Sequence, residues 1–101
     1  MEEKKIKIIE QAVIQWFQIT RDELYNFKEI YPIGGARSIF MYLLYKNDMK
    51  SEDIRALFGY NVDRTVELRV SKVQMEIFHH HGRYEIDVEN IEKIIEELSN
   101  N

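Results

Sequence analysis

Residues 49–77 constrain the fold of this chain more than any other stretch. Residues 52–58 have apolar side chains at helical spacing, and Gly59 follows them directly. Glycine commonly ends a helix because it readily adopts the positive φ needed there. A longer stretch then carries valines at intervals of three and four residues, which predicts a second helix with one buried stripe. A short helix, a turn and a long helix together predict a helix-turn-helix.

Three other stretches have helical periodicity and flank this unit. Residues 3–19 carry one apolar stripe, and residues 88–98 carry an apolar seam. Residues 36–45 are apolar nearly all round, so they should form the buried centre. We predict an all-α fold of five to six helices, in a single helix-turn-helix domain that spans residues 1–101. Within it, the helix-turn-helix covers about residues 51–82, and an acidic C-terminal helix covers about residues 88–98.

Several helix ends can be predicted from capping residues. Thr20 and Glu23 have the spacing of a capping box, so a short helix should run from there to about residue 26. Ser51 and Asp87 are predicted N-caps of the helices that follow them. Asn61 or Asp63 should cap the second helix of the helix-turn-helix. Residues 27–36 are expected to form a loop, with the two glycines at 34 and 35 as a turn signal.

Composition and charge limit the class of protein. Of the 101 residues, 45% are apolar, and none is cysteine, so a disulfide framework is excluded and a reducing compartment is favoured. The N-terminus has no apolar signal-peptide core, and no apolar run approaches the roughly 20 residues that span a bilayer. We therefore expect a cytoplasmic protein without a membrane partner. The formal charge of -4 is concentrated near the C-terminus, and the rest of the chain is almost neutral.

The sequence offers little for catalysis. It has no glycine-rich phosphate loop and no cysteine nucleophile, and its adjacent acidic pairs should point apart on their helices. Three consecutive histidines at residues 79–81 would point in three directions on a helix, so they favour a helix end over a shared metal ion. We expect no enzyme activity, no cofactor, no metal and no small-molecule substrate.

The outer face of the second helix has a mixed character. Opposite the valine stripe, Lys72 suits a phosphate backbone, whereas Glu67 does not. Leu68 and Met75 are large apolar side chains, and such residues on an exposed helix face are typical of protein contacts. The residues of this face are therefore compatible with either a DNA partner or a protein partner.

Nearly the whole chain resembles a known family. The segments RSIFMYL at residues 37–43 and IRALFG at residues 54–59 are similar to the C-terminal DNA-binding domain, domain IV, of the bacterial replication initiator DnaA. Thr65-Val66, followed later by Lys72-Val73, is similar as well. The resemblance implies a DnaA domain IV-like, Trp-repressor-like fold. It also implies that the helix-turn-helix and a basic loop bind a short duplex, in replication initiation or its regulation.

The resemblance retains some of the family's DNA contacts and changes others. Arg37 and Lys72 fall where the family contacts backbone phosphate, and Thr65 falls on a threonine of its recognition signature. The other signature positions differ. At one of them Val62 has no side-chain group that can hydrogen-bond a base edge. The family's basic loop aligns with residues 27–31, where Glu29 replaces an arginine. This pattern predicts altered DNA specificity.

Two functions follow as hypotheses. The first is a module that binds double-stranded DNA. The second is a degenerate domain that binds another protein through Leu68 and Met75. The residues predicted to contact DNA are Arg37, Asn61, Asp63, Arg64, Thr65 and Lys72.

Overall fold

Every regular element in the described part of the chain is a helix, as predicted. The structure is a computed structural model and describes residues 1–25, 33–59 and 65–100. The helices are α1 (Glu3–Phe17), α2 (Arg21–Tyr25), α3 (Ile33–Lys46), α4 (Ser51–Leu57), α5 (Thr65–Phe78) and α6 (Tyr84–Ser99). Among these described helices, none is both long enough and apolar enough to cross a bilayer.

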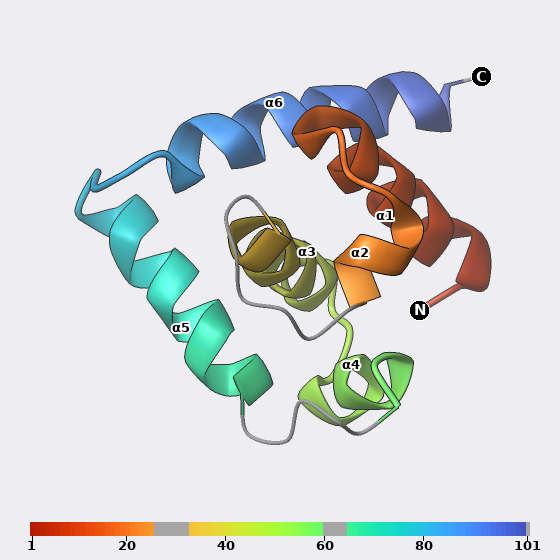
Figure 1. The fold of residues 1–101 in the computed structure, drawn as a ribbon, viewed down its shortest axis with the longest axis horizontal. Helices are drawn as coiled ribbons and strands as arrows, with labels where there is room; N and C mark the ends of the chain where they lie inside the picture. Colours follow the sequence, from red (N-terminus) through yellow and green to blue (C-terminus); the bar gives the residue numbers. More distant parts are fainter. Residues whose placement is uncertain (26–32, 60–64, 101) are drawn as a thin grey trace.

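Helix α3 is the centre of the molecule, as its apolar sequence predicts (Figure 1). It packs against all five other helices, most extensively against α5 and α1. Ile39, Phe40, Leu43 and Leu44 on α3 are fully buried. Burying large apolar side chains is the main favourable term in folding. α1, α2 and α5 therefore owe their positions largely to the faces that they place on α3, whereas α6 packs mainly on α1.

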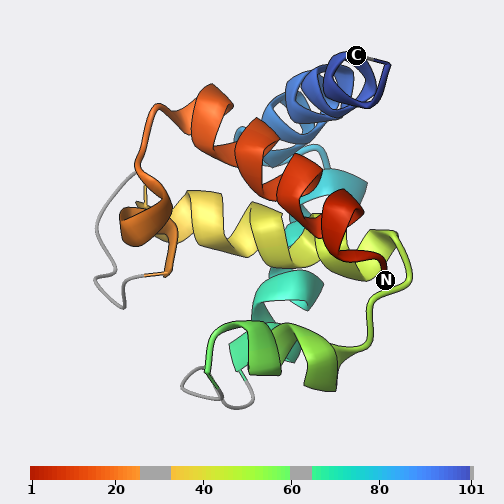
Figure 2. The same ribbon diagram turned by 90° about the vertical axis from the view of Figure 1, so that its right-hand side faces the viewer.

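Helix α6 and helix α4 lie at opposite ends of the molecule, in both views (Figures 1 and 2). α6 packs along α1, and Val88 and Ile91 of its apolar seam are buried. Lys46 Nζ at the end of α3 donates a hydrogen bond to Glu92 Oε2 of α6 at 2.9 Å. The acidic helix is thus fixed far from α4.

The capping box predicted at the start of α2 is present. The Glu23 amide donates to Thr20 Oγ1 at 3.0 Å, and the Thr20 amide donates to Glu23 Oε1 at 2.9 Å. α1 ends at Phe17, two residues before the predicted end, because Gln18 adopts a left-handed conformation with φ 54°. The predicted turn at Gly59 is confirmed by its positive φ of 70°, and Asp48, after α3, also has a positive φ of 73°.

Three predicted helix ends are wrong. α3 begins at Ile33, so Gly34 and Gly35 lie in its first turn and not in a loop. The Gly34 carbonyl there accepts hydrogen bonds from Ser38 Oγ at 3.1 Å and from Arg69 Nη1 at 3.2 Å. These bonds from α3 itself and from α5 hold the first turn of α3 in place.

The two other corrections concern N-caps. α4 begins at Ser51 itself, and Lys50 occupies the N-cap position without a side-chain bond. α6 begins at Tyr84, so Asp87 lies inside the helix. Asp87 is buried and accepts a hydrogen bond from Trp16 Nε1 of α1 at 2.9 Å. Its carboxylate serves packing between helices and not the start of α6. The predicted caps of α5, Asn61 and Asp63, lie outside the described residues.

Candidate nucleic-acid interface

Helices α4 and α5 are joined by both apolar and charged contacts. Ile54, Phe58 and Val66 are buried in the core shared with α3. Arg55 Nη1 of α4 forms an ion pair with Glu67 Oε1 of α5. Glu67 is unfavourable for a phosphate contact, and in the structure Arg55 offsets part of its negative charge.

The inward face of α5 is buried as its spacing predicts. Val66 and Val73 are fully buried, and Val70 is nearly so. Beside this stripe, Arg69 Nη1 donates a hydrogen bond to Ser38 Oγ of α3 at 2.8 Å. The sequence gives no indication of this role for Arg69, since nothing local identifies a serine on another helix as its acceptor. Through this bond α5 is fixed to α3 by polar contacts as well as by apolar packing.

The outward face of α5 is solvent-exposed. Lys72 and Ser71 are exposed, and so are Leu68 (71%), Met75 (56%) and Phe78 (76%). The exposure predicted for Leu68 and Met75 is therefore observed. Phe78 is a third exposed apolar side chain on this helix, and the sequence analysis did not identify it. It lies three residues beyond Met75, on a neighbouring part of the helix surface. The face combines one cation with three large apolar groups.

The structure describes only part of the predicted DNA contact set. Lys72 lies at the middle of α5 with its side chain exposed. Thr65 is the first residue of α5, and its side chain lies outside what the structure describes. Asn61, Asp63 and Arg64 precede α5 and also lie outside the described residues. Their predicted contacts stay predictions from sequence.

The structure argues against a phosphate contact for Arg37. This side chain is only 1% exposed. Its Nε donates to the Leu24 carbonyl at 3.0 Å, and its Nη2 donates to the Glu23 carbonyl at 3.4 Å. Carbonyls in the last turn of a helix have no partner within the helix, and Arg37 supplies donors to these two at the end of α2. Its guanidinium is therefore part of the core and does not belong to the DNA-contacting surface.

Two polar clusters outside α5 are structural. The buried Glu10 carboxylate of α1 accepts hydrogen bonds from the Tyr25 hydroxyl and from Arg21 Nε, the latter at 2.8 Å. Burial of the ring, together with these Glu10 contacts, raises the pKa of Tyr25 above its ordinary value. The hydrogen bond to Glu92 similarly raises the pKa of Lys46. Both clusters join helices.

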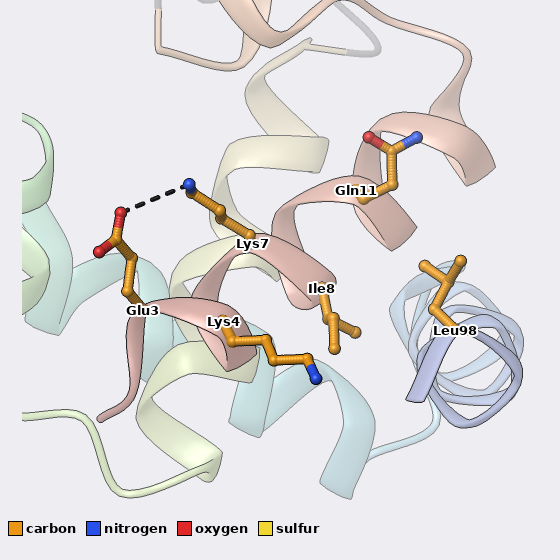
Figure 3. A pocket seen from close by; sticks show the side chains of 6 residues that line it. All are labelled: Glu3, Lys4, Lys7, Ile8, Gln11 and Leu98. Carbon is orange, nitrogen blue, oxygen red and sulfur yellow. Dashed lines mark ion pairs between the residues drawn. The ribbon is translucent and has the colours of Figure 1, made fainter. Parts of the chain in front are cut away.

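A hollow lies between α1 and α6 on the surface of the described residues. It measures about 620 Å³ and lies between Ile8 of α1 and Leu98 of α6 (Figure 3). Lys7 and Glu3 form an ion pair at its rim, with Nζ and Oε1 3.4 Å apart. Ligand sites usually combine an apolar cavity with several convergent polar groups. Lys4 and Gln11 line the hollow as well, but all of its polar side chains lie on α1 and α6 contributes Leu98, so polar groups do not converge on it from both helices.

The histidine segment closes α5 without forming a metal site. α5 ends at Phe78, and His80 has a left-handed φ of 56°. His80 Nδ1 lies 2.7 Å from Glu85 Oε2 in α6. Within the described part of the chain, no three histidine or acidic side chains converge as metal ligands do.

Comparison of the chain with models of known protein families found no match, and comparison with curated proteins found none either. The resemblance to DnaA domain IV therefore stays a prediction from the residues quoted above.

Proposed function

We propose that this chain is a helix-turn-helix module that binds double-stranded DNA through α5 and the residues that precede it. The observation that supports the proposal best is the placement of α5. Its valine stripe is buried on α3, it contacts α4, and its opposite face is open to solvent along the helix. A recognition helix needs such a face to enter the major groove.

The distribution of charge supports the same proposal. α6 carries six acidic residues and one lysine, and it lies at the end of the molecule opposite α4. DNA phosphates that meet α4 and the start of α5 are therefore distant from the helix that carries the excess of negative charge. Exposed charges separated by more than about 10 Å are largely screened at ordinary ionic strength.

The proposed contacts divide into backbone and base contacts. Lys72 holds a phosphate, and Arg64 and Asn61 read guanine and adenine edges respectively. Asp63 and Thr65 meet the groove beside them. Leu68, near the start of the exposed face, packs against a thymine methyl group, a contact that apolar side chains make in the major groove. Replacement of several family contacts then yields a different target sequence.

The test is fluorescence anisotropy with a random duplex pool at about 50 mM and about 200 mM salt. With the one proposed phosphate contact, at Lys72, affinity should fall about three- to fourfold between these conditions. Lys72→Ala should weaken binding to all duplexes and lower the salt slope by about one. Lys93→Ala is the matched control, because it removes an exposed lysine from α6.

Circular dichroism establishes whether each variant remains folded. If the folded protein retains no duplex at the lower salt, or if Lys72→Ala and Lys93→Ala bind alike, the DNA proposal is wrong.

The exposure of Leu68, Met75 and Phe78 favours a second candidate, a module that binds protein. Three large apolar side chains on one exposed helix are more than DNA contacts require. Leu68→Asp should then abolish retention of a partner while Arg64→Ala leaves it unchanged. Under the DNA proposal both substitutions should weaken duplex binding, so Arg64→Ala is the variant that distinguishes the two candidates.

A further inference from the structure

The exposed residues of α5 follow the spacing of a coiled-coil seam. Leu68, Ser71, Met75 and Phe78 succeed one another at intervals of three, four and three residues. This is the alternation of a and d positions in a heptad, with Leu68 and Met75 at a. All four side chains are exposed, and α5 is already folded on α3. A second helix could therefore pack here without the ordering cost that makes short isolated helices unstable.

The charges beside this seam specify the partner and its direction. In the same register Glu67 is a g residue and Lys72 is the e residue five positions later. In a parallel pair of identical helices, each g residue meets the e residue five positions on in the partner. Glu67 of one copy would thus meet Lys72 of the other, twice by symmetry. In an antiparallel pair, e residues face e residues, and the two Lys72 side chains would repel.

We propose that two copies of this chain associate through the outer faces of α5, with the helices parallel and in register. Leu68 and Met75 pack on their counterparts, Phe78 closes the seam at the C-terminal end, and two Glu67–Lys72 pairs flank it. The Glu67 side chain is 47% exposed and already pairs with Arg55, so Lys72 of the second copy would join this existing ion pair.

The proposed dimer covers Lys72 and Leu68, which the proposed DNA interface also uses. Dimer and duplex would therefore compete for α5, and self-association would regulate DNA binding. This regulatory consequence rests on the proposed DNA function, whereas the association itself does not.

Sedimentation velocity over a range of concentrations tests the association. The wild type should show a reversible dimer, and Leu68→Asp should be monomeric. The matched control is Ile86→Asp, which changes an apolar side chain on α6 that is 51% exposed, and it should dimerise as the wild type does. Lys72→Ala should weaken the dimer about fivefold through loss of two exposed ion pairs. A monomeric wild type, equal effects of the two aspartates, or a dimer strengthened by Lys72→Ala would overturn the proposal.

Cross-linking tests the register independently, because the chain has no native cysteine. Ser71→Cys places a thiol beside its own counterpart in a parallel, in-register pair, so mild oxidation should give a covalent dimer. Gln15→Cys, an exposed position on α1, should stay monomeric under the same conditions. Equal cross-linking of the two variants would refute the parallel pairing.

The same variant separates the two proposals. Reduced Ser71→Cys should bind duplex, and the oxidised dimer should not. If neither form binds while the dimer persists, the DNA proposal fails and the association stands. If both forms bind equally, the competition is refuted.

Discussion

The guanidinium of Arg37 donates hydrogen bonds to two carbonyls at the end of α2, and almost none of the side chain reaches solvent. An exposed arginine and a buried one look the same in a sequence. Arg37 lies in the otherwise apolar stretch of α3, whose burial was predictable. The acceptors on α2 were not, because they are backbone atoms more than ten residues away.

Arg37→Met should therefore destabilise the fold rather than weaken DNA binding selectively. Loss of donors to the buried Leu24 carbonyl and the partly buried Glu23 carbonyl should lower the free energy of unfolding by about 2–3 kcal/mol. Urea denaturation followed by circular dichroism measures this change. Lys72→Met, at an exposed site, should stay within about 0.5 kcal/mol of the wild type. An Arg37→Met protein of unchanged stability that has lost duplex binding would restore the phosphate role.

The Tyr25 hydroxyl should make the stability of the fold depend on pH in the alkaline range. Its pKa is raised above 10.0 by burial and by its hydrogen bond to Glu10. Since the folded state holds this proton more tightly, the associated stability is present below about pH 10 and is lost as pH rises further, by up to about 1.4 kcal/mol per pH unit.

Urea unfolding of the wild type and Tyr25→Phe between about pH 8 and about pH 11 tests this dependence. Tyr25→Phe should be about 1 kcal/mol less stable at neutral pH through loss of the hydrogen bond, and the difference should shrink above about pH 10. The raised pKa of Lys46 acts in the same direction but is common to both proteins. A constant difference across the range would show that Tyr25 does not titrate with unfolding.

At the scale of elements, apolar periodicity was the reliable signal. It predicts correctly that α3 is the centre of the fold and which face of α5 is buried. The helix boundaries were less predictable. In the sequence Gly34 and Gly35 suggest a loop, whereas in the structure both lie in the first turn of α3. Bonds from Ser38 and Arg69 to the Gly34 carbonyl support that turn, and no local rule anticipates the one from Arg69. Of the candidate interface, the exposed face was predictable, whereas the burial of Arg37 was not.

The helical conformation of Gly35 predicts a stabilising substitution. A Cβ added there would lie 4.0 Å from Tyr84 Cε1, an ordinary van der Waals distance. Gly35→Ala should raise stability by about 0.5–1 kcal/mol, because alanine loses less conformational freedom on entering a helix. The melting temperature should rise by about 2–8 °C.

Gly82→Ala is the matched control for this substitution. Gly82 has φ +64°, so a side chain there is strained and the melting temperature should fall. Equal responses of the two glycines would show that the start of α3 is not helical.

At the scale of the whole molecule, α1 and α6 connect the two ends of the chain. Trp16 Nε1 donates to Asp87 Oδ1 across 71 positions of sequence. Trp16 is the single tryptophan, so its fluorescence reports on this contact. Because all helices share one core around α3, we expect them to unfold together.

Asp87→Ala should lower the free energy of unfolding by about 1–3 kcal/mol, because it leaves the indole N–H without this acceptor. Its unfolding curves from fluorescence and from far-UV circular dichroism should still coincide. Asp87→Asn keeps one acceptor oxygen and should lose less stability. Separated curves would indicate that α1 and α6 unfold as an independent unit.

The central position of α3 has a consequence for mutational tolerance. Because each of the other helices packs directly on α3, the integrity of the fold depends mainly on their inward faces. The outward face of α5 can then change from polar to apolar, or from one charge to the other, with little effect on the core. A molecule built in this way can acquire new binding partners through successive surface substitutions while its architecture persists.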